Sequence, residues 1–397
     1  MEKVLITGGT GFIGSRLAEF LCRRGNIKIR ILVRDWRTAA QAARFPVEFR
    51  PGDMTDLDAV KSALEGCDTV FHCAYDFKGT WREIKRNNLK GARNVAESAA
   101  SNGARVVHVS SIDVFGLTGS AILDESTPKK AIRGDSYSQT KLAIEQLLLR
   151  ARHEQGLRLT VVYPSIVFGP YATTWTVNPV RKMKQWRIPL LNQGSGICNA
   201  VYIDDVVQGL VLAAESEKAE GLDIFLSGPD AITWKEFYGF YEKMLGQSGT
   251  VEISMNDLRV LERQSWTSAS MGAMLKLLMD PVFREKLGSI PAIARLYEKI
   301  FRFLPSSWRA RIARGLLTRT RRLEKRTDNT EFEKPILIGD LRRLPLYSMQ
   351  ARVSCEKARR VLGFEPKVSV AEGMKRTKQF LLWARLLPTG RMEATGV

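Results

Sequence analysis

The stretch VLITGGTGFIGSRLAEFL, at residues 4–21, decides the fold of this chain. It begins as a short β-branched run, passes through Gly8, Gly11 and Gly14, and continues with the apolar spacing of a helix. Glycines at these positions allow a tight turn and let backbone N–H groups approach a pyrophosphate, whose charge the positive end of the helix attracts. The run therefore predicts a dinucleotide-binding loop between a strand and a helix.

Strand-like and helix-like runs alternate over the first 170 residues. This alternation predicts an α/β fold, in which a Rossmann-type, doubly wound parallel sheet carries helices on both faces. Further along, two short strands at 200–203 and 224–226 are expected on either side of a helix at 204–215. The other expected strands are 4–7, 29–33, 47–50, 69–73, 106–110 and 160–163, and the other expected helices are 15–24, 56–65, 81–102 and 137–154.

The break in alternation after residue 170 divides the chain into two expected domains. Residues 1–170 and 199–230 are expected to form the dinucleotide-binding Rossmann domain. Residues 171–198 and 231–397 are expected to form a smaller, mainly helical substrate-binding lobe, which contains a basic helical insertion at about 265–345.

Charge and cysteine content restrict the class of protein. The 397 residues carry 61 Lys and Arg against 42 Asp and Glu, a net charge of +19. The five cysteines are odd in number and form no C-x-x-C pair, which argues against a disulfide framework and a metal site. The sequence shows no secretory signal and no apolar run long enough to cross a bilayer, so a cytoplasmic protein is expected.

Part of the positive charge is concentrated between Arg302 and Arg326, where nine Arg or Lys accompany one acid, Glu324. Apolar residues and Trp308 recur there at helical spacing, so 290–326 reads as a basic amphipathic stretch. Three interpretations stay open: a helical lobe packed on the core, a cap over the substrate pocket, and a peripheral contact with an anionic membrane surface. Because the charge is local, no nucleic-acid partner is expected.

The end of the second expected strand, ILVRD, bears on which dinucleotide binds. An acid at this tip bonds the ribose 2′-OH of NAD, but Val33 holds the position and is followed by Arg34 and Asp35. A guanidinium matches a 2′-phosphate, so Arg34, unless it is a solvated surface charge, favours NADP(H). Asp53, after the third strand, is placed to bond the adenine amino group or to cap the next helix.

The segment YSQTK carries the candidate proton-transfer residues. Tyr137 and Lys141 are four residues apart on an expected helix, so both side chains lie on one face. A nearby ammonium lowers the pKa of a tyrosine, and Tyr137 can then exchange a proton with a substrate hydroxyl or carbonyl as a hydride moves. Ser110 and Ser111 end a strand, where ligands bind in such sheets, and Ser111 can hold the substrate oxygen.

Seven motifs occur in a fixed order: TGGTGFIG, GDMTD, FHCAY, VSSIDVFG, YSQTK, YPSIVFGP and VYIDDV. Over about 1–240, and again over 348–385, the chain resembles the extended short-chain dehydrogenase/reductase superfamily, which includes NAD-dependent epimerases and dehydratases. The SSIDVFG and NAVYIDD segments are also similar to those of 3β-hydroxysteroid dehydrogenases and dihydroflavonol-reductase-like enzymes.

This resemblance implies roles for particular residues. Ser111, Tyr137 and Lys141 match the catalytic positions, and the helices at 81–102 and 137–154 match a homodimer interface. With the residues discussed above, the resemblance completes an expected cofactor-binding set: Gly8, Gly11, Phe12, Ile13, Gly14, Arg34, Asp53, Met54, Ala74, Asn88, Ser110, Tyr137, Lys141, Pro164 and Ile166.

Two departures from the family pattern bear on the reaction. Where 4,6-dehydratases carry Thr-Asp-Glu, this chain has Ser111, Ile112 and Asp113, so the acid is lost and 4,6-dehydration is not expected. Where nucleotide-sugar epimerases often place an arginine that holds the diphosphate, Cys198 offers no cation. Asn178 resembles a substrate-contacting asparagine of the epimerases, and Ser111, Asp113 and Asn178 form the expected substrate-binding set.

Together these features favour an NAD(P)-dependent oxidoreductase, leaning to NADP, that interconverts a secondary alcohol and a ketone with Tyr137 as general acid and base. The substrate is expected to be a small molecule with a hydroxyl or carbonyl group. Two alternatives stay open: a nucleotide-sugar epimerase with tightly bound NAD, and a non-catalytic NAD(P)-binding protein.

Overall fold

The computed structural model describes residues 1–261, 334–337 and 343–388. The chain divides into two compact units, of which the first comprises Met1–Ser254 and Gly339–Val397 and the second Met255–Ile338. Most of the expected basic insertion at 265–345, including 290–326, lies outside the described residues. None of the helices described is long and apolar enough to cross a membrane.

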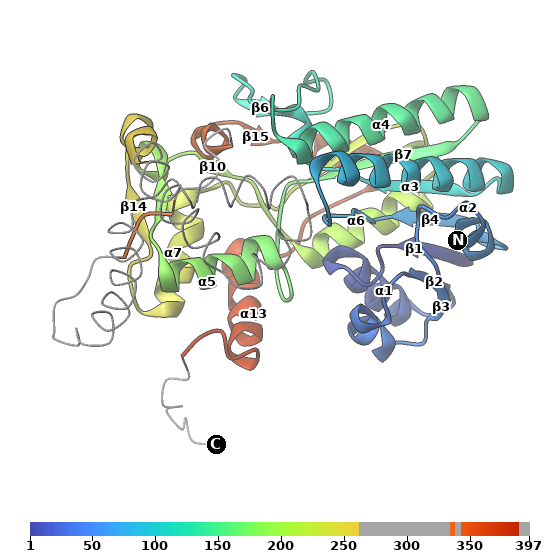
Figure 1. Cartoon of the computed structure of the whole chain (residues 1–397), viewed down its shortest axis with the longest axis horizontal. Helices are drawn as coiled ribbons and strands as arrows, with labels where there is room; N and C mark the ends of the chain where they lie inside the picture. The colour runs from blue at the N-terminus through green and yellow to red at the C-terminus, as the bar shows by residue number, and fades with distance from the viewer. Residues whose placement is uncertain (262–333, 338–342, 389–397) are drawn as a thin grey trace, which may run out of the picture. The chain divides into compact units, whose positions relative to one another are not determined.

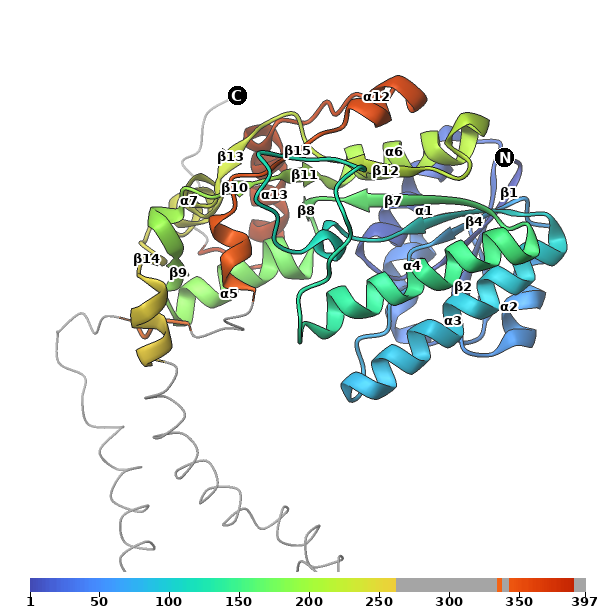
Figure 2. The same ribbon diagram turned by 90° about the horizontal axis from the view of Figure 1, so that it is seen from above.

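A seven-stranded sheet forms the centre of the first unit (Figures 1 and 2). Its order is β12-β7-β5-β4-β1-β2-β3, and all neighbouring strands are parallel. The order reverses between β1 and β4, and ligands bind at the carboxyl ends of strands beside such a switch point. The strands are β1 (Lys3–Thr7), β2 (Lys28–Val33), β3 (Glu48–Pro51), β4 (Thr69–His72), β5 (Arg105–Val109), β7 (Arg158–Pro164) and β12 (Asp223–Leu226).

Helices cover both faces of this sheet (Figure 2). In β1, Val4 and Ile6 join the core that contains α1 and α6, whereas Leu5 joins the core that contains α2, α3 and α4. The expected Rossmann-type, doubly wound α/β fold is thereby confirmed. The helices are α1 (Phe12–Arg24), α2 (Leu57–Leu64), α3 (Trp81–Asn102), α4 (Ser136–Gln155) and α6 (Ile203–Glu215).

The boundaries of α3 and α4 follow from strong local signals. The Thr80 hydroxyl accepts a hydrogen bond from the Glu83 N–H, and the Glu83 carboxylate accepts one from the Thr80 N–H, which makes a capping box. Gly103 ends α3 in the left-handed region at φ +65°. At the start of α4, the Asp135 carboxylate accepts a hydrogen bond of 3.1 Å from the Ser138 N–H.

The two strands expected after residue 170 occupy different places. β12 extends the main sheet beside β7, whereas β11 (Ala200–Tyr202) pairs with β8 (Ile166–Phe168) in a separate two-stranded sheet. Other elements complete the first unit, and several of them are only two or three residues long. They include α5 (Asn178–Gln185), α7 (Trp234–Leu245), α12 (Glu356–Leu362), α13 (Val370–Trp383), β6 (Ile122–Leu123), β9 (Ile188–Leu190), β10 (Ile197–Cys198), β13 (Ile232–Thr233), β14 (Thr250–Glu252) and β15 (Arg352–Val353), and the short helices η1 (Trp36–Arg44), η2 (Ile112–Phe115) and η6 (Leu344–Ser348).

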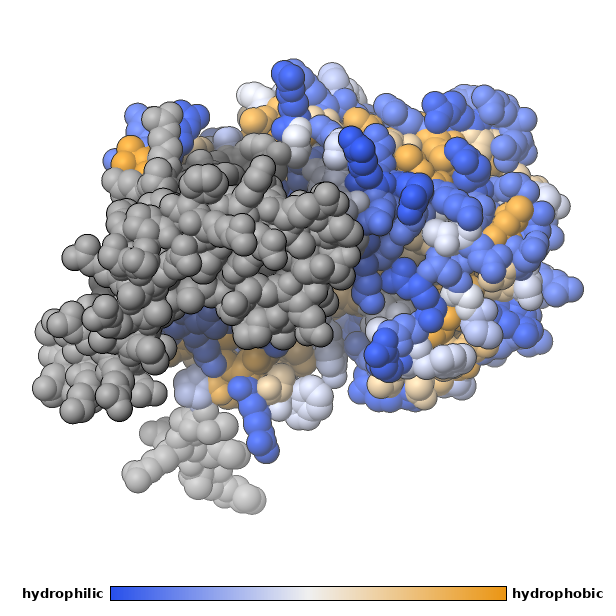
Figure 3. All heavy atoms as spheres, in the orientation of Figure 1, coloured by the Kyte–Doolittle hydropathy of each residue, from blue (hydrophilic) through white to orange (hydrophobic). Residues whose placement is uncertain are grey.

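The segments expected in a separate substrate lobe share a core with the sheet. Met183 of α5 and Trp234 of α7 belong to the same cluster of buried side chains as Val4 of β1. The compact units divide after Ser254 and before Gly339. The division into a dinucleotide-binding domain and a substrate lobe stays a prediction. On the face shown in Figure 3, the described surface is mainly hydrophilic, with hydrophobic side chains in small areas.

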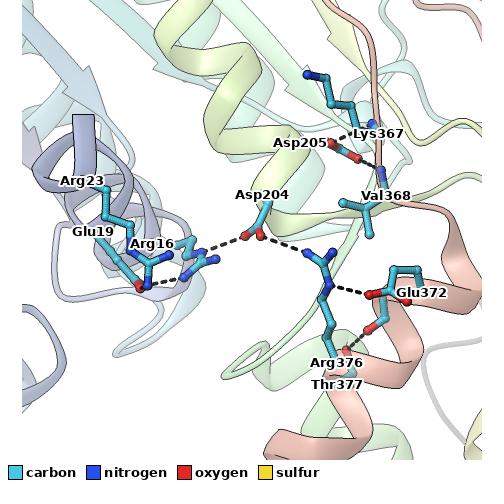
Figure 4. A network of polar contacts seen from close by, with 11 residues as sticks. Arg16, Glu19, Arg23, Asp204, Asp205, Lys367, Val368, Glu372, Arg376 and Thr377 are labelled. Atoms are coloured by element: carbon cyan, nitrogen blue, oxygen red, sulfur yellow. Dashed lines mark hydrogen bonds and ion pairs between the residues drawn. The ribbon is translucent and has the colours of Figure 1, made fainter.

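The VYIDDV motif ties the C-terminal helices to the dinucleotide-binding half (Figure 4). Asp204 forms ion pairs with Arg16 of α1 at 2.7 Å and with Arg376 of α13 at 3.6 Å. The Asp205 carboxylate accepts hydrogen bonds from the N–H groups of Lys367 and Val368. The second segment that resembles the superfamily, at 348–385, is therefore fixed to the first through this pair of aspartates.

The outer face of α3 is strongly basic. Arg82, Arg86, Lys90 and Arg93 all lie at exposed positions of this helix. A two-fold dimer through α3 and α4 would bring these like charges toward the same charges of a second copy, which costs energy unless acids face them. The homodimer stays a prediction. Because salt screens the repulsion between like charges, this charge pattern favours dissociation of such a dimer at low salt.

Two histidines are buried side by side in the middle of the sheet. His72 of β4 and His108 of β5 are neighbours in the strand register, with ring centroids 5.2 Å apart. His72 Nδ1 shares a hydrogen bond of 2.7 Å with the Thr7 hydroxyl, and within the described residues no polar group bonds either nitrogen of His108. Burial lowers the pKa of His72 to about 3 and the pKa of His108 well below 6.5, and the charge of Lys141 lowers both further.

We expect these two rings to make the fold sensitive to mild acid. Below pH 6.5 an unfolded histidine binds a proton, whereas the folded rings stay neutral, so the unfolded state binds more protons and stability falls. For two such groups the free energy of unfolding decreases by about 2 kcal/mol between pH 6.5 and 5.5. Urea unfolding at both pH values measures this change. His108→Leu should halve the pH dependence and exposed His153→Gln should not, and equal behaviour of the two variants would contradict the prediction.

Candidate active site

The glycine loop joins β1 to α1 in a turn without room for side chains. Gly8 lies at φ +72°, and a Cβ there would come within 2.7 Å of the backbone of Ala74. A Cβ on Gly14 would overlap the carbonyl oxygen of Gly8, which accepts a hydrogen bond of 2.9 Å from the Gly11 N–H. The chain therefore needs glycine at positions 8 and 14 to form this turn.

A pyrophosphate fits the start of α1. Gly11 is the N-cap residue, and it has no side chain to bond the N–H groups of the first turn, including those of Phe12 and Ile13. A Cβ on Gly11 would meet nothing closer than the Gly8 oxygen at 3.2 Å, so this side of the turn is open. N–H groups at a helix N-terminus attract a phosphate group.

The tip of β2 is followed by two arginines, Arg34 and Arg37. Arg34, whose side chain is 47% exposed, bridges Asp53 and Asp76 at 3.3 Å each. The Asp35 carboxylate is held by the N–H and guanidinium of Arg37, so it caps η1. No free carboxylate therefore occupies the tip where an NAD-specific site requires one, among the residues that the structure describes.

The remaining expected cofactor residues support the loops around the turn. Asp56 caps α2, which leaves Asp53 to accept hydrogen bonds from the Thr55 N–H and Arg34. The Met54 thioether packs against α3 at Gly91.

Asn88 is 2% exposed, and its side-chain amide forms hydrogen bonds with the backbone of the loop that follows β4. It accepts from the Asp76 N–H and donates to the carbonyls of Asp76 and Ile84. Asn88 therefore supports this loop, and Ala74 in the same loop packs against Gly8.

Ser111 and Tyr137 meet at the carboxyl end of the sheet. The Ser111 hydroxyl lies in hydrogen-bond contact with Tyr137, which is partly buried at the start of α4. The rings of Tyr75 and Phe77 lie 5.1 and 6.2 Å from the Tyr137 ring. Burial raises the pKa of Tyr137 above its usual value near 10, the nearby charge of Asp113 raises it further, and the hydrogen bond from Ser111 lowers it.

Lys141 lies one helical turn after Tyr137 and is 4% exposed. Its ammonium donates a hydrogen bond of 2.8 Å to the Val109 carbonyl and lies 5.1 Å from the centroid of the Tyr75 ring. Burial lowers the pKa of Lys141 to about 8, whereas Cys73 and Glu145 favour its charged form. The structure thus places Ser111 against Tyr137, and Lys141 one turn further along the same helix.

Glu145 is a buried centre of hydrogen bonds that the sequence reasoning missed. Its carboxylate accepts hydrogen bonds from Ser110 and from the Tyr163 hydroxyl, the latter at 2.8 Å, and pairs with Lys129 at 3.0 Å. Burial raises the pKa of Glu145, and the charge of Lys129 opposes that shift. Glu145 thus joins the ends of β5 and β7 to α4, four residues beyond Lys141. The four-residue spacing from Lys141 to Glu145 in YSQTKLAIE, which puts both side chains on one face of the helix, is the sequence signal that could have identified Glu145.

Arg343 was also missed, and it comes from the C-terminal part of the chain. Its guanidinium pairs with Asp113 and, at 3.7 Å, with Asp135, and it lies 5.9 Å from the centre of the Tyr137 ring. Burial raises the pKa of Asp113, and the charge of Arg343 opposes this shift. No local pattern in the sequence marks Arg343 as a site residue.

A mainly apolar cavity of about 60 Å³ lies beside the turn that follows Ser111. Asp113, Asn199 and Arg343 are the polar side chains in a wall that also contains Ile112, Gly116, Leu123, Ile166, Trp175, Ile197, Trp234, Leu346, Tyr347, Met349 and Ala351. Ligand pockets usually measure about 300–1,000 Å³, so this cavity is smaller than a typical ligand pocket.

Other expected site residues lie around this cavity or away from it. Ile166 lines the cavity and Pro164 ends the neighbouring strand β7, whereas Asn178 begins α5 and is not part of the lining. The Ser110 hydroxyl is bonded to Glu145 and not turned to a free surface. Cys198, at the position of the missing arginine, is fully buried in β10.

Curated relatives match a little more than half of the chain. A ketoreductase of Stigmatella aurantiaca that acts on 4-hydroxy-2-methyl-3-oxo-4-farnesyl-3,4-dihydroquinoline-1-oxide is 31% identical over 222 residues, which are 54% of this chain and 64% of the relative. The 3-beta-hydroxysteroid dehydrogenase of Mycolicibacterium neoaurum is 28% identical over 254 residues, 60% of this chain and 68% of the relative. The chain spans less than two thirds of the length of the first of these relatives.

Solved structures share the fold at lower identity. The UDP-glucuronic acid 4-epimerase of Bacillus cereus, solved in complex with NAD, superposes with a TM-score of 0.65 at 16% identity, covering 96% of this chain and 99% of the epimerase. Residues 4–226, more than half of the chain, match the model of one family. With its glycine turn, parallel sheet and Ser–Tyr–Lys site, the chain belongs to the NAD dependent epimerase/dehydratase family.

Proposed function

We propose that this chain is an NAD(P)-dependent oxidoreductase that interconverts a secondary alcohol and a ketone on a mainly apolar molecule. The observation that carries the proposal is the cavity beside Ser111, whose wall is apolar apart from a few polar side chains. Such a wall recognises a substrate by burial of hydrocarbon or aromatic surface, with few polar groups to orient it. The ketoreductase and steroid dehydrogenase relatives act on molecules of this kind by their names.

The residues support acid–base chemistry at one oxygen. In the reducing direction, the Ser111 hydroxyl bonds the ketone oxygen and Tyr137 gives it a proton, and in the oxidising direction the Tyr137 phenolate takes that proton back. A bound nicotinamide supplies or accepts the hydride at the adjacent carbon. Because burial raises the pKa of Tyr137, the unaided residue stays protonated and can donate a proton but not accept one. The oxidising direction therefore depends on nearby positive charge that lowers this pKa, as the charge of Arg343 does.

A nucleotide-sugar epimerase is the second candidate function, supported by the shared fold with the Bacillus cereus enzyme. The buried thiol of Cys198 argues against it, because burial raises the pKa of this thiol well above 9 and keeps it neutral. A neutral buried thiol offers a diphosphate no counter-charge.

For the cofactor we propose NADP(H), because Arg34 is half-exposed beside the glycine turn and Asp35 is occupied by Arg37. Arg34→Ala is expected to weaken NADPH binding about 10–100-fold and NADH binding about 3-fold or less, since a guanidinium–phosphate contact contributes about 1.5–3 kcal/mol. Fluorescence titration measures both constants. Arg44→Ala, at an exposed position of η1, is the matched control. Equal losses for the two cofactors would contradict the preference.

The function is tested by following absorbance at 340 nm with the purified full chain. NADPH and NADH are each offered with a 3-oxosteroid, an oxo-quinoline and UDP-glucuronic acid. We expect absorbance to fall with an apolar ketone in proportion to the alcohol formed. Conversion of the UDP-sugar alone, with no change in absorbance, would overturn the proposal in favour of the epimerase.

A further inference from the structure

We propose that Arg343 is a positioning residue of the catalytic site. By bridging Asp113 and Asp135, it fixes the position of Ser111 relative to Tyr137. This inference rests on the proposed function, because it concerns the same tyrosine. It goes beyond the family, since Arg343 lies outside the matched residues 4–226.

The two bridged aspartates belong to the segments that carry the catalytic side chains. Asp113 follows Ser111 by two residues, and its N–H donates to the Ser111 hydroxyl oxygen at 3.2 Å. Asp135 precedes Tyr137 by two residues and is the N-cap of α4. One guanidinium that pairs with both carboxylates therefore sets the distance between the strand end of β5 and the helix start of α4.

The bridge lies in a sheltered place, where an ion pair has more effect than at the surface. The side chains of Arg343, Asp113 and Asp135 are 31%, 15% and 7% exposed. Without Arg343, two buried carboxylates would face each other, since the charge of Asp135 raises the pKa of Asp113. Removing the cation of such a group leaves its acids uncompensated, and they then move apart or bind protons.

Arg343 also acts on Tyr137 through its charge. The guanidinium lies 5.9 Å from the ring and lowers the pKa of Tyr137, against burial, Asp113 and Tyr75, which raise it. The other titratable groups of this region are Asp135 at the start of α4, Lys141 within it and Tyr347 of η6, which lies within the field of both Arg343 and Asp113. Arg343 is thus a cation whose charge favours the phenolate form of Tyr137.

The test compares Arg343→Met, Arg343→Lys and the control Arg352→Met in the full-length chain. Arg352 is exposed on β15, close in sequence to Arg343. With an alcohol that the 340 nm assay shows to be oxidised, we expect Arg343→Met to lower kcat about 10–100-fold. The Kd of the Arg343→Met variant for the cofactor should stay unchanged. The pH below which its kcat falls (the acid limb of the pH profile) should rise by about one unit, as expected for the loss of a positive charge at this distance from Tyr137. Arg343→Lys should restore the limb but not the full kcat, because lysine cannot bridge both carboxylates. Arg352→Met should match the wild type.

A purely structural role would change KM or thermal stability and leave the pH limb in place, and this result would overturn the inference. If Arg343→Met does not fold, Arg343→Lys and Asp135→Asn replace it in the test. Wild-type kcat and a wild-type pH limb in both of these variants would equally overturn the inference. A wild-type chain without turnover, indistinguishable from Tyr137→Phe, would show that the proposed function itself is wrong. Activity lost in Tyr137→Phe but normal in every Arg343 variant would reject this inference alone.

Discussion

Replacing Tyr137 by phenylalanine is expected to lower turnover about 10²–10⁴-fold while leaving dinucleotide binding intact. The change removes one hydroxyl, and general acid–base catalysis by a positioned side chain contributes a factor of this size. The ring and its contacts with Tyr75 and Phe77 remain, so the fold around the site is preserved. The rate is measured at 340 nm, and the cofactor Kd by quenching of protein fluorescence.

The matched control for this prediction is Tyr171→Phe. Tyr171 contacts Phe380 of α13 with ring centroids 4.5 Å apart, in a different part of the first unit, and its hydroxyl has no expected role. We expect wild-type turnover from this variant. Turnover of Tyr137→Phe within threefold of the wild type would remove Tyr137 from the mechanism.

Replacing Gly14 by alanine is expected to abolish useful cofactor binding. The added methyl group would overlap the Gly8 carbonyl, so either α1 or the turn has to move away from the pyrophosphate position. Loss of two charge-assisted hydrogen bonds at about 1.5 kcal/mol each weakens the affinity about 100-fold or more. Isothermal titration with NADP⁺ and NAD⁺ measures the effect. A loss of about 1–3 kcal/mol in stability should accompany it, as for other overpacked sites.

Gly239→Ala is the control, because Gly239 is also within a helix, α7, but has no atom within 4 Å of the added Cβ. Alanine there should leave cofactor binding unchanged and raise stability by about 0.5–1 kcal/mol through its better helix propensity. Equal cofactor affinity in the Gly14 and Gly239 variants would show that the turn is not the pyrophosphate site.

The main sheet could be predicted because its determinants are local. Central strands such as β1 and β5 are buried runs rich in β-branched residues, and helices carry caps such as the Thr80–Glu83 box. The short strands β8 and β11 pair with each other outside the main sheet, and no run of three residues encodes that choice of partner.

The distinction between local and long-range determinants also applies to the candidate active site. Ser111, Tyr137 and Lys141 stand at a strand end and at helical spacing, and the resemblance to the superfamily supplied their expected roles. Arg343 and Asp113 are 230 residues apart, and only the folded chain brings them together.

The central claim is net hydride transfer to a ketone carbon, and one measurement tests it most directly. The full-length chain is incubated with [4-²H]NADPH, with both faces of the nicotinamide labelled, and the apolar ketone found active at 340 nm. The isolated alcohol is then examined by mass spectrometry and NMR. We predict one deuterium on the carbinol carbon for each cofactor oxidised. Alcohol formed without deuterium, or cofactor that stays reduced while the substrate changes configuration, would contradict the account.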